Sequence, residues 1–307
     1  VYLNDEQLTF ASGLTTTLQT STAPDKYDNK VYCAAFLGTD NQSAASELVT
    51  VSDGLWTNDH RLQGIAYLYI RLEFDQEAFP QGEPQISAVI KGKKVYNPNT
   101  ATTAWSANAA LCLRDYLTAA YGINADSDEI DDTSFITAMN VCDENVTLAA
   151  GGTESRYEVN GSFTTATQPD RVIESLTKSM AGSVWYAQGK FRVKAGAYTT
   201  PVYTFDEDDL LGNLQIQTRR SRQQNFNMVN GKFSGEESNW MQTDYPEVRL
   251  SATTITNIDG GEEIKTSLDL PFTSTSTMAQ RIAKILLFRN REQIVVNATM
   301  GLRAMQV

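Results

Sequence analysis

The sequence predicts an α+β protein in which antiparallel β modules, sandwich-like or barrel-like, carry inserted helices. Two observations support this class. Segments rich in β-branched and aromatic residues, separated by turn residues, make up both ends of the chain. The middle of the chain instead places apolar residues at the three-and-four spacing of a helix. With 307 residues, 41% hydrophobic and 20% charged, the chain is long enough for two or three globular domains.

The first predicted module, residues 1–95, is a β-sandwich-like unit. Its turns carry proline, glycine and acidic residues, as in the run from Pro80 to Pro84. An antiparallel sandwich or meander fits this pattern. The strand candidates are Lys30–Leu37, Glu47–Val51, Ile65–Phe74 and Gln85–Lys91.

The second module, residues 96–154, is predicted to be a helical insertion. Ser106 is the expected N-cap of a helix that Gly122 ends. Another helix starts near Asp132 and runs to about Asp143, and the acidic loop before it suits the positive end of the helix dipole. The apolar side of this second helix consists of Phe135, Ile136, Met139 and Cys142.

The third module, residues 155–205, is predicted to be a helix followed by a β-hairpin. Thr167 is the expected cap of a helix that begins at Gln168 and Pro169 and ends at Gly182. The strand candidates Ser183–Ala187 and Lys190–Lys194 then flank a two-residue turn.

The fourth module, residues 206–307, is predicted to be barrel-like with one helix. The helix covers about Thr277–Phe288, and Arg289 and Arg291 follow it at the end that a helix dipole favours for cations. A last strand is expected to start near Gln293. The other strand candidates are Leu214–Thr218, Met228–Phe233, Val248–Ile255 and Ile264–Leu270.

The charge and hydropathy of the chain exclude several classes of function. The formal net charge is −12, from 25 Lys and Arg against 37 Asp and Glu. Direct nucleic-acid binding is not expected, because it requires cations that neutralise phosphates. There is no run of about 18 apolar residues, so we expect no membrane span, and no signal peptide is visible. The chain opens in strand-like sequence at Val1 without Met, so we expect a slice of a longer polypeptide.

The nucleophilic and metal-ligating residues are few. The cysteines Cys33, Cys112 and Cys142 form no CxxC pair and are expected to be idle thiols rather than a disulfide or a zinc site. Ser-His-Asp or Cys-His catalysis would have to use His60, the sole histidine. His60 lies in a polar loop before a strand, so a loop or interface role is expected.

Two acidic runs are candidates for a catalytic or calcium site. Asp206–Asp209 could supply a glycosidase pair or Ca²⁺ ligands, and Asn124–Glu129 loosely resembles a calcium loop. Neither has the spacing of an EF-hand. We expect the first run to be a solvated turn, or the cap of a short helical turn over Asp208–Gly212. The sequence therefore predicts no catalytic residue, no metal site and no cofactor.

The remaining clusters favour structural roles. The basic run Arg219–Arg222 favours ion pairs between subunits over nucleic-acid contacts. The pairs Gly151-Gly152 and Gly260-Gly261 are expected turn glycines, not phosphate-binding loops. Most strand aromatics are expected in the core, and a minority at subunit contacts. These aromatics are Trp56, Tyr67, Tyr69, Trp105, Trp185 and Tyr186.

An ordered set of short motifs runs through nearly the whole chain. The first motif, at Ala88–Pro98, is a strand that ends in a basic glycine turn and Val-Tyr-x-Pro. The second, at Trp105–Leu117, is a Trp-Ser-x-Asn cap followed by a helix with Arg-Asp-Tyr-Leu. The order resembles the tail tip proteins of long-tailed bacteriophages, the family typified by the lambda host-specificity protein J. Where the family usually has Asp-Pro-Arg after Val-Tyr, this chain has Asn97-Pro98-Asn99. The other matching positions are Trp56, His60–Arg61, Gly64–Tyr67, Phe79–Pro84, Ala138–Glu144, Arg156–Tyr157, Asn160–Gly161, Gly189–Lys190, Asp209–Gly212, Asn227–Gly231 and Ala279–Ala283.

The resemblance implies a structural, non-enzymatic role. It implies a homotrimer that closes the distal end of the tail tube as a central hub, with pseudo-sixfold symmetry where a hexameric tube meets it. The implied partners are the distal tail protein, the tape measure protein, tail fibres and a host surface receptor. It places the protein in the virion tail tip, and in the host cytoplasm before assembly. The net negative charge suggests a conduit that does not retain DNA during ejection.

Two other functions stay open on the sequence. One is a receptor- or glycan-binding module of the same tail tip. The other is an enzyme such as a tail-borne cell-wall hydrolase, which the lone histidine disfavours, although carboxylate-only hydrolysis passes that test. Helices inserted between β modules favour the hub.

Overall fold

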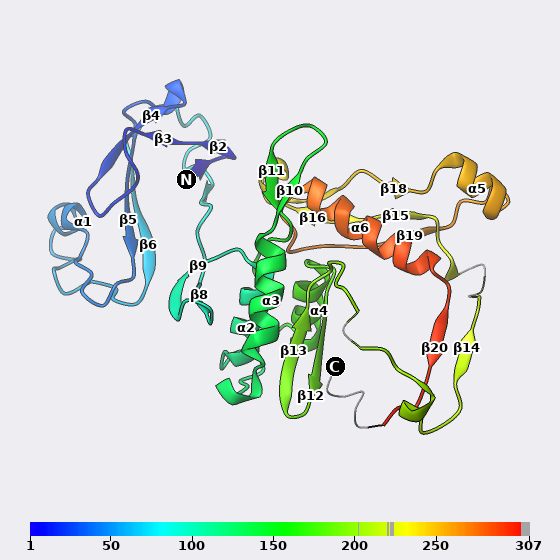
Figure 1. Cartoon of the computed structure of the whole chain (residues 1–307). Coiled ribbons are helices and arrows are strands. Elements are labelled where there is room, and N and C mark those ends of the chain that lie inside the picture. The colour runs from blue at the N-terminus through cyan, green and yellow to red at the C-terminus, as the bar shows by residue number, and fades with distance from the viewer. Residues whose placement is uncertain (202, 220, 222–223, 302–307) are drawn as a thin grey trace. The chain divides into compact units, whose positions relative to one another are not determined.

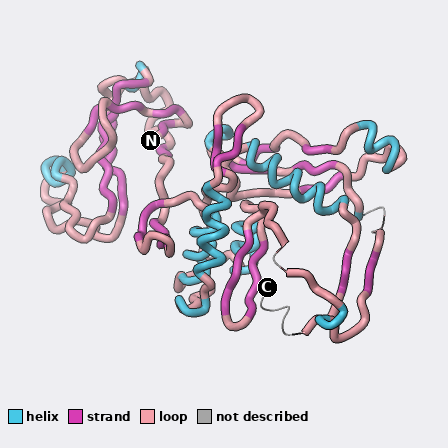
Figure 2. Tube along the Cα trace, in the orientation of Figure 1, coloured by secondary structure: helices cyan, strands magenta, loops and turns pink. Residues whose placement is uncertain are grey.

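The computed structural model describes residues 1–201, 203–219, 221 and 224–301. It divides into two compact units, Val1–Lys91 and Gly92–Val307. Six α-helices accompany many short strands in sheets of two to four strands, which confirms the α+β class (Figures 1 and 2). The strand pairs are antiparallel apart from one, and the described residues form no closed barrel. The four-module division of the sequence stays a prediction.

The first unit is built on the long pair of β5 (Val31–Leu37) and β6 (Ala66–Leu72). These strands pair over their full length, from Val31 opposite Leu72 to Leu37 opposite Ala66, and confirm two predicted strands. Smaller strands complete their sheet, which has the order β3-β4-β5-β6, and form a second sheet of order β2-β1-β7. Their bounds are β1 Tyr2–Leu3, β2 Glu6–Gln7, β3 Thr9–Phe10, β4 Gln19–Ala23 and β7 Ile86–Ser87.

One strand prediction in this unit is wrong, and another is confirmed only in part. Glu47–Val51 is not a strand but part of the helix α1 (Ser46–Val51). Helical spacing lets Leu48 pack on Ala34 and Phe36 of β5, while Val51 stays exposed. Periodicity cannot distinguish such a short apolar run from a strand. Within Gln85–Lys91 only β7 is a strand, and Val89 and Ile90 are exposed.

The second unit begins with a hairpin and a pair of helices. The hairpin is β8 (Lys94–Asn97) and β9 (Thr102–Trp105), and the helices are α2 (Ala109–Thr118) and α3 (Asp132–Asp143). Both predicted helices are confirmed, but the N-cap of α2 is Asn108, not Ser106. The Asn108 side chain accepts hydrogen bonds from the backbone of Ala110 and Leu111. Ser106 supports this cap from outside, because its hydroxyl accepts the Asn108 N–H at 3.1 Å.

The predicted helix and hairpin of residues 155–205 are confirmed. The helix α4 (Pro169–Lys178) buries Val172 and Leu176, but its N-cap is Gln168 and not the expected Thr167, and no side chain caps it. Strands β12 (Ser183–Ala187) and β13 (Lys190–Lys194) pair in the expected register around Gln188-Gly189. A further hairpin of β10 (Asn145–Thr147) and β11 (Thr153–Ser155) carries Gly151 and Gly152 in its turn, both with positive φ, as expected of turn glycines.

The C-terminal strands form three separate small sheets rather than one barrel. Gly231 divides the predicted strand Met228–Phe233 into β15 (Met228–Asn230) and β16 (Lys232–Ser234), which join different sheets. The second half of Val248–Ile255 is not a strand but the helix α5 (Ala252–Ile258), capped by the Ser251 hydroxyl. The other elements are β17 Gln242–Asp244, β18 Val248–Arg249, β19 Lys265–Ser267 and the helix α6 Ser276–Arg291.

One apolar core joins the elements of the second unit. It includes residues of α2, α3 and α4, such as Leu113, Phe135 and Val172, together with Val229 of β15 and Ile282 of α6. Burial of this many apolar side chains is the main stabilising contribution to such a fold. Side chains from residues 95 to 287 therefore share a single core.

Candidate assembly surface

The long helix α6 is fixed at its N-terminus by acids from distant segments. Glu154 of β11 accepts a hydrogen bond from the Thr277 hydroxyl at 2.9 Å and pairs with Arg281. The side chains of Arg281 and Glu154 are only 16% and 15% exposed. Glu237 accepts from the Ser276 backbone N–H at 3.0 Å. Glu237 thus satisfies a backbone donor at the start of the helix, Glu154 accepts from side chains there, and both negative charges suit the helix dipole, so they hold three remote segments together.

A two-stranded ribbon lies just beyond the other end of α6. It pairs β14 (Gln215–Gln217) with β20 (Val295–Asn297), with Ile216 opposite Val296. Its strands confirm the predicted strand within Leu214–Thr218 and the last strand expected after Gln293. Figure 2 shows it as a narrow pair of strands leading away from the end of α6. Beyond these strands, Leu210 bridges to Met300, which extends the pairing.

The ribbon has one apolar face, and that face is exposed. Side chains alternate between the two faces of a strand, so Leu214 and Ile216 share a face with Ile294 and Val296. These four side chains are 46%, 56%, 63% and 54% exposed, respectively. The opposite face carries the amides Gln215, Gln217 and Asn297 together with Val295. An exposed apolar face of this kind is a candidate contact surface.

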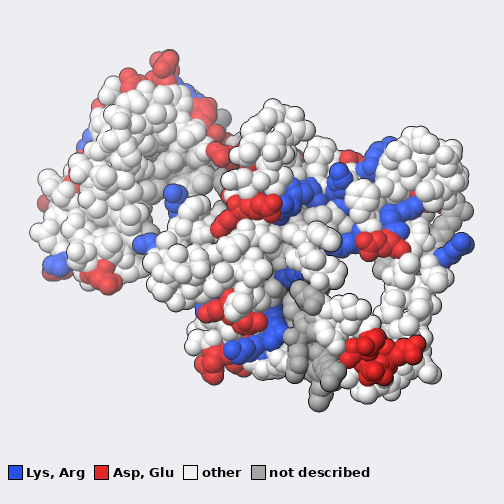
Figure 3. Space-filling view, in the orientation of Figure 1, with Lys and Arg blue, Asp and Glu red and all other residues white. Residues whose placement is uncertain are grey.

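The acidic run Asp206–Asp209 lies at the far end of this ribbon. It forms the 3-10 turn η3 (Glu207–Asp209), with Asp206 as N-cap, which corrects the expected span of Asp208–Gly212. Asp209 is buried and accepts a hydrogen bond from the Tyr203 hydroxyl at 3.2 Å, while the other three acids are exposed. Figure 3 shows them as a red group over η3. Three of the four acids are therefore solvated in a turn, as expected, and the fourth, Asp209, is buried within it.

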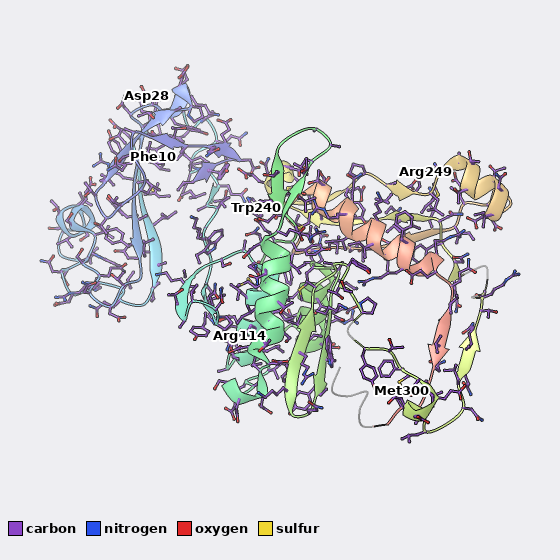
Figure 4. The ribbon with its side chains drawn as sticks, viewed as in Figure 1. Phe10, Asp28, Arg114, Trp240, Arg249 and Met300 are labelled. Atoms are coloured by element: carbon purple, nitrogen blue, oxygen red, sulfur yellow. The ribbon has the colours of Figure 1, made fainter. Side chains whose placement is uncertain are left out.

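Met300 marks where the ribbon meets this acidic turn (Figure 4). The Leu211 N–H donates to the Thr299 oxygen at 2.8 Å, and the Gly301 N–H donates to the Asp209 oxygen at 2.9 Å. Leu211 itself is 71% exposed. The exposed apolar surface therefore continues from the ribbon toward η3.

The other candidate residues of the sequence lie in separate loops and turns. His60 lies in an exposed loop, where its Nδ1 accepts the Thr57 N–H at 2.9 Å and its ring stacks on Trp56 at 4.9 Å. The acidic segment Asn124–Glu129 contains a 3-10 turn held by the Asp126 N–H donating to Glu129 at 3.0 Å. Arg219 is exposed, whereas Arg220 and Arg222 lie outside the described residues.

The described residues contain no group of His, Cys, Asp or Glu arranged to hold a metal ion. The cysteines are free thiols, as expected. Burial raises the pKa of Cys33 to about 11 and the pKa of Cys142 to about 12. Such thiols are poor nucleophiles. Within the described part of the chain, no helix has the length and apolarity needed to cross a bilayer.

The expectation that most of the strand aromatics are core is wrong for several of them. Trp105, Trp185 and Tyr186 are 40%, 42% and 55% exposed. Tyr67 and Tyr69 are half-buried against the small cluster of Ala34, Phe36 and Ala45. A short two-stranded sheet has two faces, and at most one of them packs against the core. Aromatic side chains on the other face therefore remain at the surface.

The sequence predicted both strands of the ribbon but not its exposed apolar face. The signal was the alternation of Leu214 and Ile216 with two glutamines, matched by Ile294 and Val296 on the other strand. The pairing register places Ile216 opposite Val296 on one face, and the alternation of side chains along each strand adds Leu214 and Ile294 to it.

Known proteins resemble this chain in sequence and in fold. No protein-family model matches the chain. It is 23% identical over 261 residues to the tip attachment protein J of Escherichia phage SECphi27, a match that covers 76% of this chain and 21% of the relative. The chain thus spans about a fifth of that protein's length.

A solved structure shares the fold. A chain in the virion of a native gene transfer agent particle superimposes with a TM-score of 0.50 at 15% identity, covering 86% of this chain and 60% of that chain. The resemblance to phage tail tip proteins drawn from the sequence is therefore confirmed. The two similarities support a structural component of a phage tail.

Proposed function

We propose that this phage tail structural protein is part of the central hub that closes the distal end of the tail tube. The exposed apolar face of the β14–β20 ribbon carries the proposal. An isolated two-stranded ribbon is marginally stable in water, and burying its apolar face against a partner would stabilise it. A hub needs such surfaces, because it is an assembly of copies and of neighbouring tail proteins.

The occupant of the ribbon face is a second copy of this chain within a homotrimer. Among the described residues the ribbon pairs with no third strand. A neighbouring copy in a ring packs against its apolar face and also covers its unpaired edges. The distal tail protein, the tape measure protein and tail fibres then contact other faces of the ring. The role is non-enzymatic and needs no cofactor.

The overall charge fits a conduit for DNA. A net charge of −12 repels a polyanion at short range, so a ring of such copies does not retain DNA during ejection. Charge reversal of acids that face the lumen is then expected to slow ejection. Unchanged ejection would count against this part of the proposal.

Mass photometry of the purified protein tests the hub. We expect a trimer, and we expect Ile216→Lys and Val296→Lys to shift the mass to the monomer. The matched controls Gln217→Lys and Asn297→Lys introduce the same charge on the amide face and are expected to leave the trimer intact. If all four variants keep the mass of the parent, the ribbon face is not the contact. A parent that stays monomeric at every concentration contradicts the homotrimer.

A binding role at the tail tip is the second candidate. The observation that favours it is a polar pocket in the first unit, lined mainly by hydroxyl and amide side chains. The virion tail tip is where such a pocket would meet a host surface receptor.

A further inference from the structure

The first unit contains a pocket of about 800 Å³ beside the N-terminus of α1. Its walls are the segment Thr16–Leu18, the residues 41–50 and the loop that carries Asn58 and Arg61. This volume is within the range of small-molecule sites, about 300–1,000 Å³. The pocket lies wholly within Val1–Lys91, far in sequence from the β14–β20 ribbon.

The lining is polar and nearly neutral. Hydroxyls come from Thr16, Thr17, Ser43, Ser46 and Thr50, and amides come from Asn41, Gln42 and Asn58. Hydroxyl and amide groups both donate and accept hydrogen bonds, which suits a ligand that does the same. One carboxylate, Glu47, and one guanidinium, Arg61, complete the polar lining. Leu18 and Ala44 are its apolar residues, so an apolar ligand gains little here.

Several of these groups are available to a ligand. The side chains of Asn41, Ser43 and Asn58 are on exposed residues and make no hydrogen bond within the described part of the chain. Glu47 pairs one carboxylate oxygen with Arg71, while its buried Oε2 has no partner among the described residues. This carboxylate is therefore held in the wall of the pocket, and the exposed amide and hydroxyl groups are the ones that a ligand can reach.

The walls of the pocket are held in place by Gln42, which is only 5% exposed. Its Oε1 accepts the Gly38 N–H at 2.7 Å, and its Nε2 donates to the Arg61 and Leu62 oxygens at 2.9 Å each. Arg61 Nε in turn donates to the Asn58 oxygen at 3.2 Å. A site fixed before binding loses less entropy when the ligand arrives.

We infer that this pocket binds a neutral saccharide. Sugar hydroxyls donate to the amide oxygens of Asn41 and Asn58, and accept from their amide N–H groups and from Arg61. An anionic ligand would face Glu47 with a single cation opposite, and a cation would face Arg61, so the charge balance favours a neutral ligand. The site rests on the second candidate function and is independent of the hub contact on the ribbon.

Binding is measured by isothermal titration or ligand-observed NMR. The neutral probes are oligosaccharides of glucose, galactose and N-acetylglucosamine, and the anionic probes are inorganic phosphate and polygalacturonate. We expect at least one neutral oligosaccharide to bind at millimolar or lower concentration. Asn58→Ala is expected to weaken binding about fivefold to tenfold, the loss of one hydrogen bond. Ser43→Trp, which fills the pocket, is expected to abolish it.

The matched control is Gln81→Ala, because Gln81 is an exposed amide of the same unit that does not line the pocket. It is expected to bind like the parent. Binding that survives Ser43→Trp, or anionic probes that bind more tightly than the neutral ones, would overturn the assignment. So would the absence of binding by every neutral oligosaccharide. Mass photometry of the same samples reports the hub contact separately, so the two proposals fail independently.

Discussion

Arg291, the last residue of α6, donates two hydrogen bonds to a single carboxylate oxygen of Asp259, at 2.9 and 3.0 Å. Asp259 is the C-cap of α5, and its other oxygen accepts from Asn227 at 2.8 Å. The side chains of Arg291 and Asp259 are only 11% and 7% exposed. This buried network fixes the end of α6 from which the β14–β20 ribbon departs, so it sets the direction of the proposed contact surface.

Breaking this pair is expected to destabilise the second unit strongly. Asp259→Asn leaves the Arg291 guanidinium buried without a counter-charge, at a cost of about 3–5 kcal/mol. Urea unfolding followed by circular dichroism measures the loss. The exposed pair of Arg249 and Glu263, with side chains 45% and 47% exposed, is the control. Arg249→Gln is expected to cost about 1 kcal/mol or less, and an equal loss in both variants would contradict the distinction.

Gly231 is expected to tolerate no side chain. A Cβ at this position would lie 2.0 Å from the Leu268 backbone oxygen, because β15 and β16 separate here against the segment that follows β19. Gly231→Ala therefore forces backbone to move and is expected to cost about 1–3 kcal/mol, as overpacking does. Gly92→Ala meets no atom within 4 Å and serves as the control. Equal unfolding midpoints for both variants would show that β15 and β16 can separate without this close contact.

The thiols are expected to react slowly in the folded protein. Burial raises the pKa of Cys112 and of Cys142 to about 12 and the pKa of Cys33 to about 11, so little thiolate is present near pH 8. Reaction with a chromogenic disulfide reagent is expected to be slow until denaturant is added, and then to release three equivalents. Fast reaction of one thiol in the native protein would mean that its segment opens locally.

Asp75 is expected to make the turn that follows β6 sensitive to acid. Hydrogen bonds from the backbone of Ala78, together with the ion pair to Lys30 at 3.1 Å, lower the pKa of Asp75 below its ordinary value. A carboxyl with a lowered pKa stabilises the fold above the unfolded pKa of about 3.9, and this contribution is lost as pH falls through the folded value. The protection factors for hydrogen exchange at Glu77 and Ala78 are therefore expected to fall at low pH.

Asp75→Asn provides the comparison. An amide oxygen still accepts hydrogen bonds but carries no charge, so the protection factors at Glu77 and Ala78 should no longer respond to acid in this range. If the parent and this variant respond to acid alike, a different carboxyl controls the turn.

The strongest local patterns predicted the structure well. Ser183–Ala187 and Lys190–Lys194 pair as expected because the two-residue turn between them fixes the register. Helix α3 matches its expected bounds because Phe135, Met139 and Cys142 recur at helical spacing and are buried. The resemblance to tail tip proteins also came from the sequence, since it depends on the order of motifs and not on their packing.

Short and ambiguous segments depended on tertiary contacts. Glu47–Val51 is rich in β-branched residues yet forms a helix, because Leu48 then reaches the cluster beside β5. Val248–Ile255 changes from strand to helix where the Ser251 hydroxyl caps α5. In segments of about six residues, such contacts outweigh intrinsic propensity.

The sequence by itself determined the α+β class, the main helices, the scarcity of catalytic groups and the relationship to tail tip proteins. These properties follow from composition, periodicity and motif order, all of which are local. Only the tertiary structure decided that Ile216 and Val296 share one exposed face, that Asp259 meets Arg291, and that Gln42 braces a polar pocket. Each depends on residues brought together from distant parts of the chain, and chain folding sets those distances.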